Sequence, residues 1–319
     1  MSRRTLWTWG RLVGCAATLA VLVWRLGAGP FLDGVRTIDA GALAAASGLV
    51  LLTTVCCAWR WKTVARGLGI DLPLPAAVAA YYRSLFLNVT LPGGVVGDVH
   101  RAVSHGLHVS DVGRAVRAVV WERFTGQVVQ AVLTLVVLLA LPSPVQSFMP
   151  PVAIGVVAVA LGVVLLVRLR PGGGRSGWAR ARGAVIADIR DGLLARRAWL
   201  GIALASAVVV AGHAATFLIA ARTVGISAPP SQMLPIALLV MLAMVLPSAA
   251  GWGPREGVTA WAFAAAGLGA HKGVTAAVAY GVMVLVASLP GAVVLLVAWF
   301  RRSRPRERTE PLLRERVHA

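Results

Sequence analysis

Long apolar stretches, separated by short arginine-rich loops, constrain this chain more than any other feature. Several of them reach the ~17–25 residues that a helix needs to cross a bilayer. Only 13% of the 319 residues are charged, against about 25% in a soluble domain. We therefore predict an all-α fold, a polytopic helical membrane protein with about seven to nine membrane segments. Two of these segments are expected to be broken or re-entrant, near residues 91–101 and 246–256.

Those two stretches interrupt the apolar pattern with proline, glycine and charge. The first reads LPGGVVGDVHR and the second LPSAAGWGPRE. Basic residues flank the first stretch on both sides, so a re-entrant helix pair fits the charge pattern better than a full crossing. Proline opens the helical backbone, and glycine allows close approach or unusual dihedral angles. The expected backbone breaks are Pro92, Gly93, Gly94, Gly97, Pro247, Gly251 and Gly253.

The spacing of the two stretches raises the hypothesis of an internal duplication. They begin 155 residues apart (246 minus 91), about half of the chain. Broken segments at corresponding positions of two halves are typical of transporters, whose substrates bind near the breaks. No close residue-level repeat accompanies this pattern in the sequence, so the duplication stays a hypothesis at this point.

The distribution of arginine predicts the orientation of the chain in the cytoplasmic membrane. We expect a first membrane helix at 6–27 and a second at about 41–59. A cytoplasmic loop with Arg60, Lys62 and Arg66 follows the second helix. The loop between the two helices lacks such an excess of basic residues, which places it outside and the N-terminus inside. The basic chain end predicts a cytoplasmic C-terminus as well.

The chain is expected to form one integral membrane domain, 1–300, followed by a basic cytoplasmic tail, 301–319. The loop 168–197 contains eight arginines and two aspartates. It is interpreted either as an amphipathic helix on the lipid surface or as a solvated loop. The formal net charge of +19 is attributed to orientation and to contact with anionic lipid. Because no separate basic domain exists, no nucleic-acid partner is expected.

Six ionisable residues lie inside or beside the membrane region at the breaks. A charge at the bilayer centre costs at least ~2.5–3.5 kcal/mol on insertion scales, so these residues should face the protein interior in pairs. Three acids balance three arginines, and we expect cross-pairing between the three regions to form one buried polar cluster. The candidate substrate-binding residues are Asp98, Arg101, Glu122, Arg123, Arg255 and Glu256.

Two interpretations of this cluster remain open. It either fixes the packing of broken helices, or it forms a polar path for a charged group. The rigid fork of donors in arginine matches phosphate, and helix N-termini after the breaks add partial positive charge. The ligand favoured by this chemistry is an anionic or zwitterionic lipid headgroup. His213 is expected to make an interhelical hydrogen bond, with a proton relay as the alternative.

No cofactor and no metal is expected. His100, His105, His108 and Asp111 have helical spacing in part, but a loop at the membrane edge is favoured over a metal site. No nucleophile motif with a catalytic partner is evident, so we do not expect an enzyme.

Three ordered motifs resemble the lysylphosphatidylglycerol synthase transmembrane-region family, also called flippase-like domain proteins. They are Leu91-Pro92-Gly93-Gly94 with Gly97-Asp98 and Arg101, Glu122-Arg123 with Gly126, and Gly251-Trp252-Gly253-Pro254-Arg255-Glu256. The resemblance implies a helical membrane domain with re-entrant segments that acts in lipid translocation. In large bifunctional members the aminoacyl-lipid synthase is a separate soluble domain after the membrane part. The sequence to Ala319 contains none, so we do not expect this chain to aminoacylate lipid itself.

The leading functional hypothesis is therefore a flippase-like protein that translocates membrane lipids with a polar or anionic headgroup. One alternative is a non-transporting membrane partner that scaffolds a separately encoded, membrane-associated glycosyl- or aminoacyl-transferase. A further alternative is an integral lipid-modifying enzyme, which is less favoured because no nucleophile or metal motif is evident.

Overall fold

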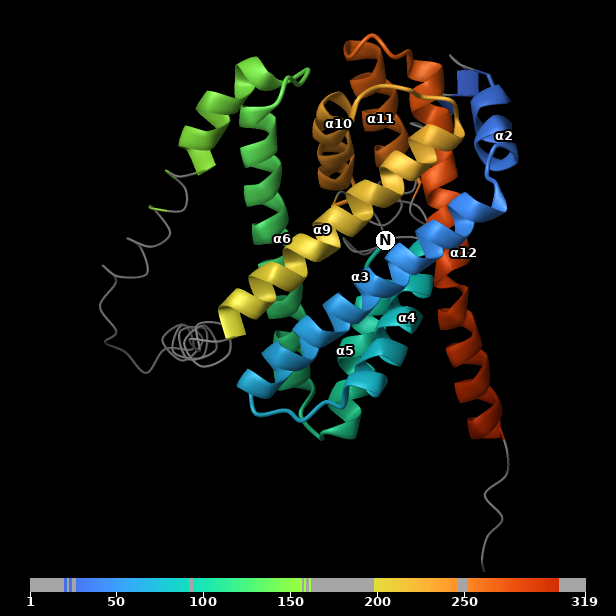
Figure 1. Ribbon diagram of the computed structural model, residues 1–319. Helices are drawn as coiled ribbons and strands as arrows, with labels where there is room; N and C mark the ends of the chain where they lie inside the picture. The colour runs from blue at the N-terminus through green and yellow to red at the C-terminus, as the bar shows by residue number, and fades with distance from the viewer. Residues whose placement is uncertain are drawn as a thin grey trace, which may run out of the picture.

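The computed structural model describes residues 27–91, 94–156, 198–245 and 252–303, with single residues at 20, 21, 23, 24, 158 and 161. Most of the described chain is helical (Figure 1), and residues 149–156 are helical as well. In chain order the helices are α2 (Gly29–Arg36), α3 (Ala40–Gly67), α4 (Leu74–Thr90), α5 (Val96–His108), α6 (Val112–Ala140), the 3-10 helix η1 (Gln146–Phe148), α9 (Ala198–Thr223), α10 (Pro230–Ala243), α11 (Pro254–Ala265) and α12 (Ala270–Ser303).

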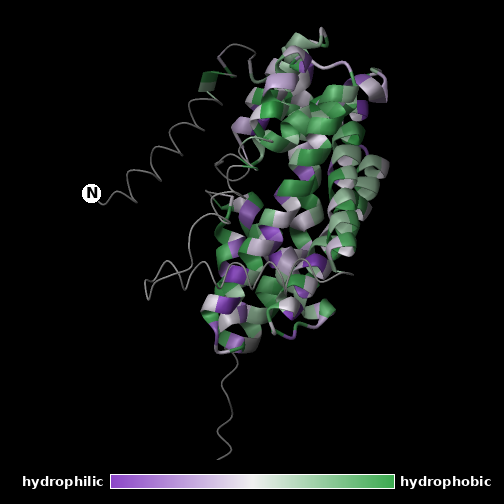
Figure 2. Cartoon of the chain, turned by 90° about the vertical axis from the view of Figure 1, so that its left-hand side faces the viewer, coloured by the Kyte–Doolittle hydropathy of each residue, from purple (hydrophilic) through white to green (hydrophobic). Residues whose placement is uncertain are grey.

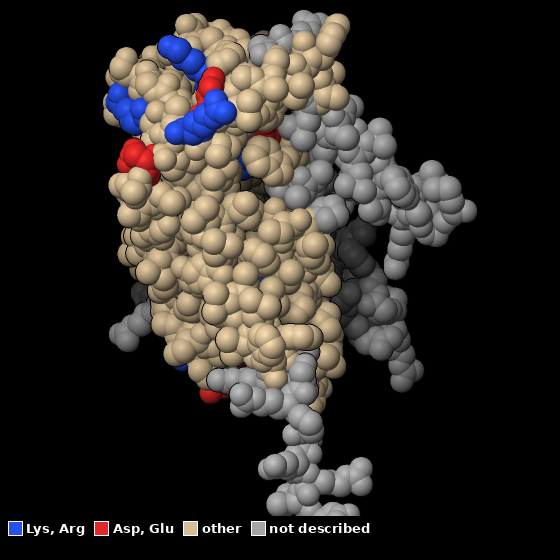
Figure 3. All heavy atoms as spheres, turned by 90° about the vertical axis from the view of Figure 1, so that its right-hand side faces the viewer, with Lys and Arg blue, Asp and Glu red and all other residues tan. Residues whose placement is uncertain are grey.

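Four of the described helices, α3, α6, α9 and α12, are long and apolar enough to cross a membrane. Figure 2 shows hydrophobic residues over much of the helical body. On the face shown in Figure 3, charged side chains gather mainly at the end where α2 lies, above a broad uncharged surface. These four helices agree with the predicted helical membrane fold. The predicted number of membrane segments stays a prediction. The predicted helix at 6–27, the loop 168–197 and the tail 301–319 lie almost wholly outside the described residues.

Helix α3 does not end where the sequence predicted. It continues to Gly67, so Arg60 lies within a helix rather than in a cytoplasmic loop. The Arg60 residue is only 4% exposed. The prediction of a loop at this position was wrong, because the charge of Arg60 is compensated inside the protein.

Side-chain caps mark the starts of α3 and α6. The Asp39 carboxylate accepts a hydrogen bond from the Ala42 amide at 2.8 Å, which starts α3. The Asp111 carboxylate does the same for the Arg114 amide at the start of α6. Such caps satisfy amide groups that have no partner in the first helical turn.

The short helices α4 and α5 form an antiparallel hairpin. The Gly97 amide donates to Asn88 Oδ1 at 2.7 Å, and Ser84 Oγ donates to Asp98 Oδ1 at 3.1 Å. A side chain at Gly97 would overlap the backbone carbonyl of Ser84. The hairpin therefore depends on glycine at this position for its close approach.

A second antiparallel hairpin is formed by α10 and α11. Gln232 Nε2, near the start of α10, donates to the carbonyl of Ala266, just after α11, at 3.2 Å. The turn into α11 passes through Gly253 at φ 110°, a conformation that favours glycine. Of the other expected breaks, Gly94 has φ 66° and Gly97 lies inside α5. Pro92, Gly93, Pro247 and Gly251 lie outside the described residues.

The helices α3–α6 and α9–α12 form two structural repeats. Equivalent helices are α3 and α9, α4 and α10, α5 and α11, and α6 and α12. The second helix of each pair begins 158 residues after the first (198 minus 40, 254 minus 96 and 270 minus 112), except in the pair α4 and α10, where the interval is 156 residues (230 minus 74). In each repeat the first helix packs on the second and fourth, and the third packs on the second and fourth. The packing between repeats is also reciprocal, since α12 contacts α3 and α4 as α6 contacts α9 and α10.

Equivalent helices of the two repeats run in opposite directions. The space left by Gly212 of α9 is filled by Thr53 of α3, and the space left by Gly201 is filled by Trp59. Residue numbers therefore rise along α9 where they fall along α3, so these two helices are antiparallel. Figure 1 shows the same inversion for α6 and α12, and it places the α4–α5 and α10–α11 hairpins at opposite ends of the molecule. The hypothesis of a duplication is therefore supported by the structure, in inverted form.

We predict that Gly97→Ala destabilises the protein, because the new methyl group overlaps the Ser84 carbonyl. Overpacking of this kind costs ~1–3 kcal/mol. Thermal unfolding in detergent should show a melting temperature several degrees below wild type. Gly48→Ala, also in a helix but with no atom near the added methyl group, should leave stability unchanged or slightly raised. Equal melting temperatures for the two variants would contradict the packing described here.

Candidate functional site

The Glu122 carboxylate of α6 is the centre of a buried ion cluster. Its side chain has 0% exposure. Arg60 of α3 donates to its Oε1 through both Nε, at 3.0 Å, and Nη2. Tyr81 of α4 donates its hydroxyl to Oε1 at 3.0 Å, and Arg101 of α5 donates Nη2 to Oε2 at 3.0 Å. Four helices of the first repeat therefore meet at one carboxylate.

The Asp98 carboxylate extends the cluster toward the surface of α5. Its Oδ1 accepts from Arg101 Nη2 at 3.0 Å and from Arg123 Nη2 at 2.8 Å. Asn88 and Ser84 of the hairpin complete its hydrogen bonds. Asp98 thus ties the tip of the α4–α5 hairpin to α6 through Arg123.

Aromatic rings and a glycine shape the space around the guanidinium groups. The Arg101 guanidinium lies 4.1 Å from the Tyr81 ring centroid and 4.5 Å from that of Trp61. Contacts of this kind stabilise a desolvated cation. A side-chain Cβ at Gly126 would lie 2.7 Å from Arg60 Nη2, so glycine is needed there to admit the guanidinium.

The cluster carries an excess of positive charge. Three guanidinium groups, those of Arg60, Arg101 and Arg123, face two carboxylates, those of Asp98 and Glu122. The sequence predicted equal numbers of acids and arginines because it assigned Arg60 to a loop. With Arg60 included, one positive charge is uncompensated within this cluster.

The third predicted region does not join the cluster. Arg255 donates Nε and Nη2 to Oε1 of the adjacent Glu256, at 2.9 and 2.5 Å, while Glu256 Oε2 accepts from the Gly253 amide at 2.7 Å. The expectation that Arg255 and Glu256 cross-pair with the other two regions was wrong. The arginine side chain is long enough to fold back onto a carboxylate that caps the same helix.

The inverted repeat nevertheless relates the two sites. Asp98 and Glu256 are both the third residue of their helix, α5 and α11, and are 158 residues apart (256 minus 98). The same interval relates Arg123 of α6 to Gly281 of α12, and the Arg255 guanidinium occupies the space beside Gly281. Each repeat therefore pairs an acid at the hairpin with a guanidinium of the same helix, Arg101 in α5 and Arg255 in α11, and the first repeat adds Arg123 of α6.

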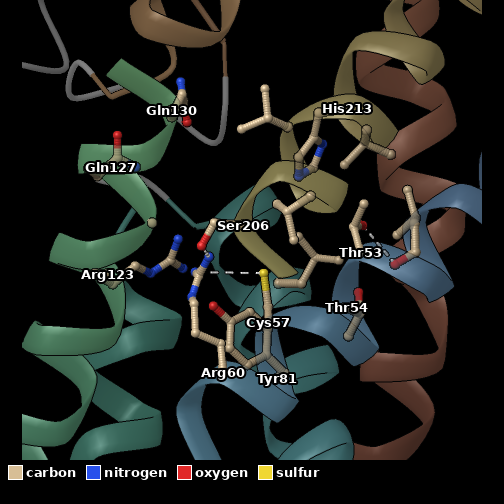
Figure 4. A pocket seen from close by; sticks show the side chains of 16 residues that line it. Thr53, Thr54, Cys57, Arg60, Tyr81, Arg123, Gln127, Gln130, Ser206 and His213 are labelled. Carbon is tan, nitrogen blue, oxygen red and sulfur yellow. Dashed lines mark hydrogen bonds between the residues drawn. The ribbon is translucent and has the colours of Figure 1, made fainter. Parts of the chain in front are cut away.

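A cavity of about 150 Å³, with both polar and apolar side chains in its walls, lies between the two repeats. Figure 4 shows Arg60, Arg123 and Ser206 at one end and His213 at the other. Ser206 of α9 accepts a hydrogen bond from Arg60 Nη1 at 2.9 Å. We name this the central cavity; its lining residues come from α3, α4, α6, α9 and α12.

A second and larger space, of about 590 Å³, lies against the outer side of Arg123. Its walls are mostly valines of α5 and α6, with Met244 and Val245 from the end of α10. We name it the lateral groove. Arg123, whose side chain is 42% exposed, and Gln127 line both spaces. A compartment that contains the polar side chains of Arg60, Ser206 and His213 and a compartment walled mainly by valines therefore meet at one guanidinium group.

The comparison with known families shows what the chain is similar to. A family model described as "Lysylphosphatidylglycerol synthase TM region" matches residues 9–291. The chain belongs to this family. Together with its apolar helices, this makes it a multi-pass membrane protein. A comparison with curated proteins finds no match.

In this member of the lysylphosphatidylglycerol synthase TM region family, sequence reasoning missed Arg60 and Tyr81 as parts of the cluster. No local signal identified Arg60, whose acidic partner lies 62 residues away. His213 does make the expected interhelical bond, between Nδ1 and the Tyr280 hydroxyl at 3.1 Å. Among the described residues, no group of three His, Cys, Asp or Glu is placed to hold a metal ion.

We predict that Arg60→Gln strongly destabilises this family member, because it leaves Glu122 with an incomplete set of charge partners. Removing one partner of a buried ion pair costs ~3–5 kcal/mol. The exposed Arg66→Gln, on the same helix, should change stability by at most ~0.5 kcal/mol. Chemical unfolding of both variants in the same detergent would measure the difference, and equal stabilities would show that Glu122 does not depend on Arg60.

Proposed function

We propose that this protein translocates lipids with a polar or anionic headgroup across the cytoplasmic membrane. The observation that carries the proposal is the meeting of the central cavity and the lateral groove at Arg123 and Gln127. A lipid has the same division into a polar group and apolar chains. Its headgroup would enter the central cavity while a chain stays in the groove.

The charge of the cluster supports an anionic group at this point. One guanidinium charge is uncompensated, and two guanidiniums, those of Arg60 and Arg123, line the central cavity. Arginine binds phosphate through paired, charge-assisted hydrogen bonds. Arg123 is the exposed member and can reach a ligand without breaking the bonds of the buried Glu122.

The inverted repeat supports transport rather than static binding. In secondary transporters with inverted repeats, substrate sites lie at the repeat interface and are formed by broken helices, and rocking of one repeat against the other gives access from alternate sides. The central cavity lies at such an interface. Helix α5, with 13 residues, rises only about 20 Å, less than the ~30 Å of a hydrocarbon core. In this proposal the two hairpins are re-entrant from opposite membrane faces, and both chain termini are cytoplasmic.

We predict that Arg123→Gln slows lipid movement in proteoliposomes. A hydrogen bond to a charged group contributes ~1.5–3 kcal/mol, and each ~1.4 kcal/mol is a factor of ten, so the initial rate should fall about tenfold or more. The assay follows fluorescent phosphatidylglycerol with a membrane-impermeant quencher. The control is Arg114→Gln, also on α6. Arg114 forms an exposed ion pair with Asp111, and neither residue lines the central cavity or the lateral groove. The lipid transport rate of this variant should stay within about twofold of wild type.

Two results would contradict the proposal. Wild-type protein that moves no lipid faster than empty vesicles would exclude translocation and favour the alternative, a non-transporting partner of a membrane-associated transferase. Equal rates for wild type, Arg123→Gln and Arg114→Gln would show that the lipid takes another route. Size-exclusion profiles of all three proteins would confirm that each is folded.

A further inference from the structure

Among the described residues that line the central cavity, the permanently charged side chains are arginines. Arg60 and Arg123 are the arginines, and His213 is the titratable group at the opposite end. Among the described residues, no aspartate or glutamate lines this cavity. A headgroup inside it therefore meets positive charge without a carboxylate contact.

The acids of the cluster do not line the cavity, and both are already engaged. Glu122 has 0% side-chain exposure, and both its oxygens accept from arginine or tyrosine. Asp98 lines the lateral groove rather than the cavity, and its oxygens accept from four side chains. An ammonium group in the cavity would find neither acid available and would lie beside like charges, an arrangement that disfavours binding.

The remaining polar lining consists of neutral groups that both donate and accept hydrogen bonds. The side-chain amides of Gln127 and Gln130 of α6 lie on one side of the cavity, and the hydroxyls of Thr53 and Thr54 of α3 lie on the other. Amides and hydroxyls satisfy hydroxyl groups of a ligand without requiring charge on it. This lining suits an alcohol better than an amine.

The size of the cavity limits the headgroup further. An engineered apolar cavity of about 150 Å³ holds a single benzene molecule, and the central cavity has about the same volume. A glycerol-sized group fits such a space, whereas an added aminoacyl group or a sugar does not. The acyl chains must stay in the lateral groove.

We propose that the central cavity selects an anionic phosphodiester lipid whose headgroup is small, uncharged and hydroxyl-bearing, and that it rejects headgroups carrying an amine. This inference rests on the proposed function and names its substrate class. It differs from the aminoacylated lipid in the family's name. The phosphate contacts Arg123, and the hydroxyls contact the Gln127 and Gln130 amides.

The test compares three fluorescent lipids in proteoliposomes of one composition: phosphatidylglycerol, phosphatidylethanolamine and lysyl-phosphatidylglycerol. Wild-type protein should move phosphatidylglycerol at least about tenfold faster than either amine-bearing lipid, a difference equivalent to ~1.4 kcal/mol. Equal rates, or faster movement of an amine-bearing lipid, would overturn the inference while leaving translocation itself in place.

Gln130→Glu adds a carboxylate to the cavity with almost no change in shape. It should shift the rate ratio at least about tenfold toward the amine-bearing lipids. Gln146→Glu makes the same chemical change at an exposed position outside the cavity and should leave the ratio within about twofold. An unchanged ratio in folded Gln130→Glu would count against the assigned contacts.

A measurement of lipid binding distinguishes failure of this inference from failure of the proposed function. Native mass spectrometry of protein purified from an equimolar mixture of the three lipids measures the bound fraction directly. If no lipid moves but phosphatidylglycerol is retained preferentially, translocation is excluded and the selectivity stands. If the three lipids are retained equally, the selectivity is wrong, whatever the transport assay shows.

Discussion

One buried carboxylate, that of Glu122, holds the first repeat together and joins it to the second. Its partners come from α3, α4 and α5, and Arg60 reaches on to Ser206 of α9. Because an ion left without its partner in such a site is strongly unfavourable, these helices are fixed relative to one another. The position of the hairpin, the crossing of the repeats and the wall of the central cavity all follow from this constraint.

The two inverted repeats use the same geometry with different residues, and this difference makes the protein asymmetric. Asp98 and Glu256 occupy equivalent positions and each pairs with an arginine of its own helix, but only Asp98 also pairs with an arginine of another helix, Arg123 of α6. In the second repeat, Arg255 closes on its neighbour and remains buried. In the first, Arg123 stands on a separate helix and faces both the central cavity and the lateral groove. A ligand therefore has an exposed guanidinium to bind on one side only.

Much of the fold was predictable, because apolar length and buried charge obey simple rules. The long helices follow from hydropathy, and Asp98, Arg101, Glu122 and Arg123 meet because charge in an apolar setting must be compensated. Arg60 was missed because an arginine after an apolar run usually marks a loop. The duplication was visible only as spacing, since equivalent residues such as Arg123 and Gly281 differ in type. Their correspondence becomes visible only because the Arg255 guanidinium occupies the space beside Gly281.

The central claim, that a lipid occupies both compartments at Arg123, is tested most directly by an experimental structure in nanodiscs of phosphatidylglycerol. The account predicts ordered density for a phosphate at the Arg123 guanidinium, a headgroup inside the central cavity beside Gln130, and an acyl chain along the valines of the lateral groove. Ordered lipid confined to the outer surface of the long helices, with only water in the central cavity, would contradict it.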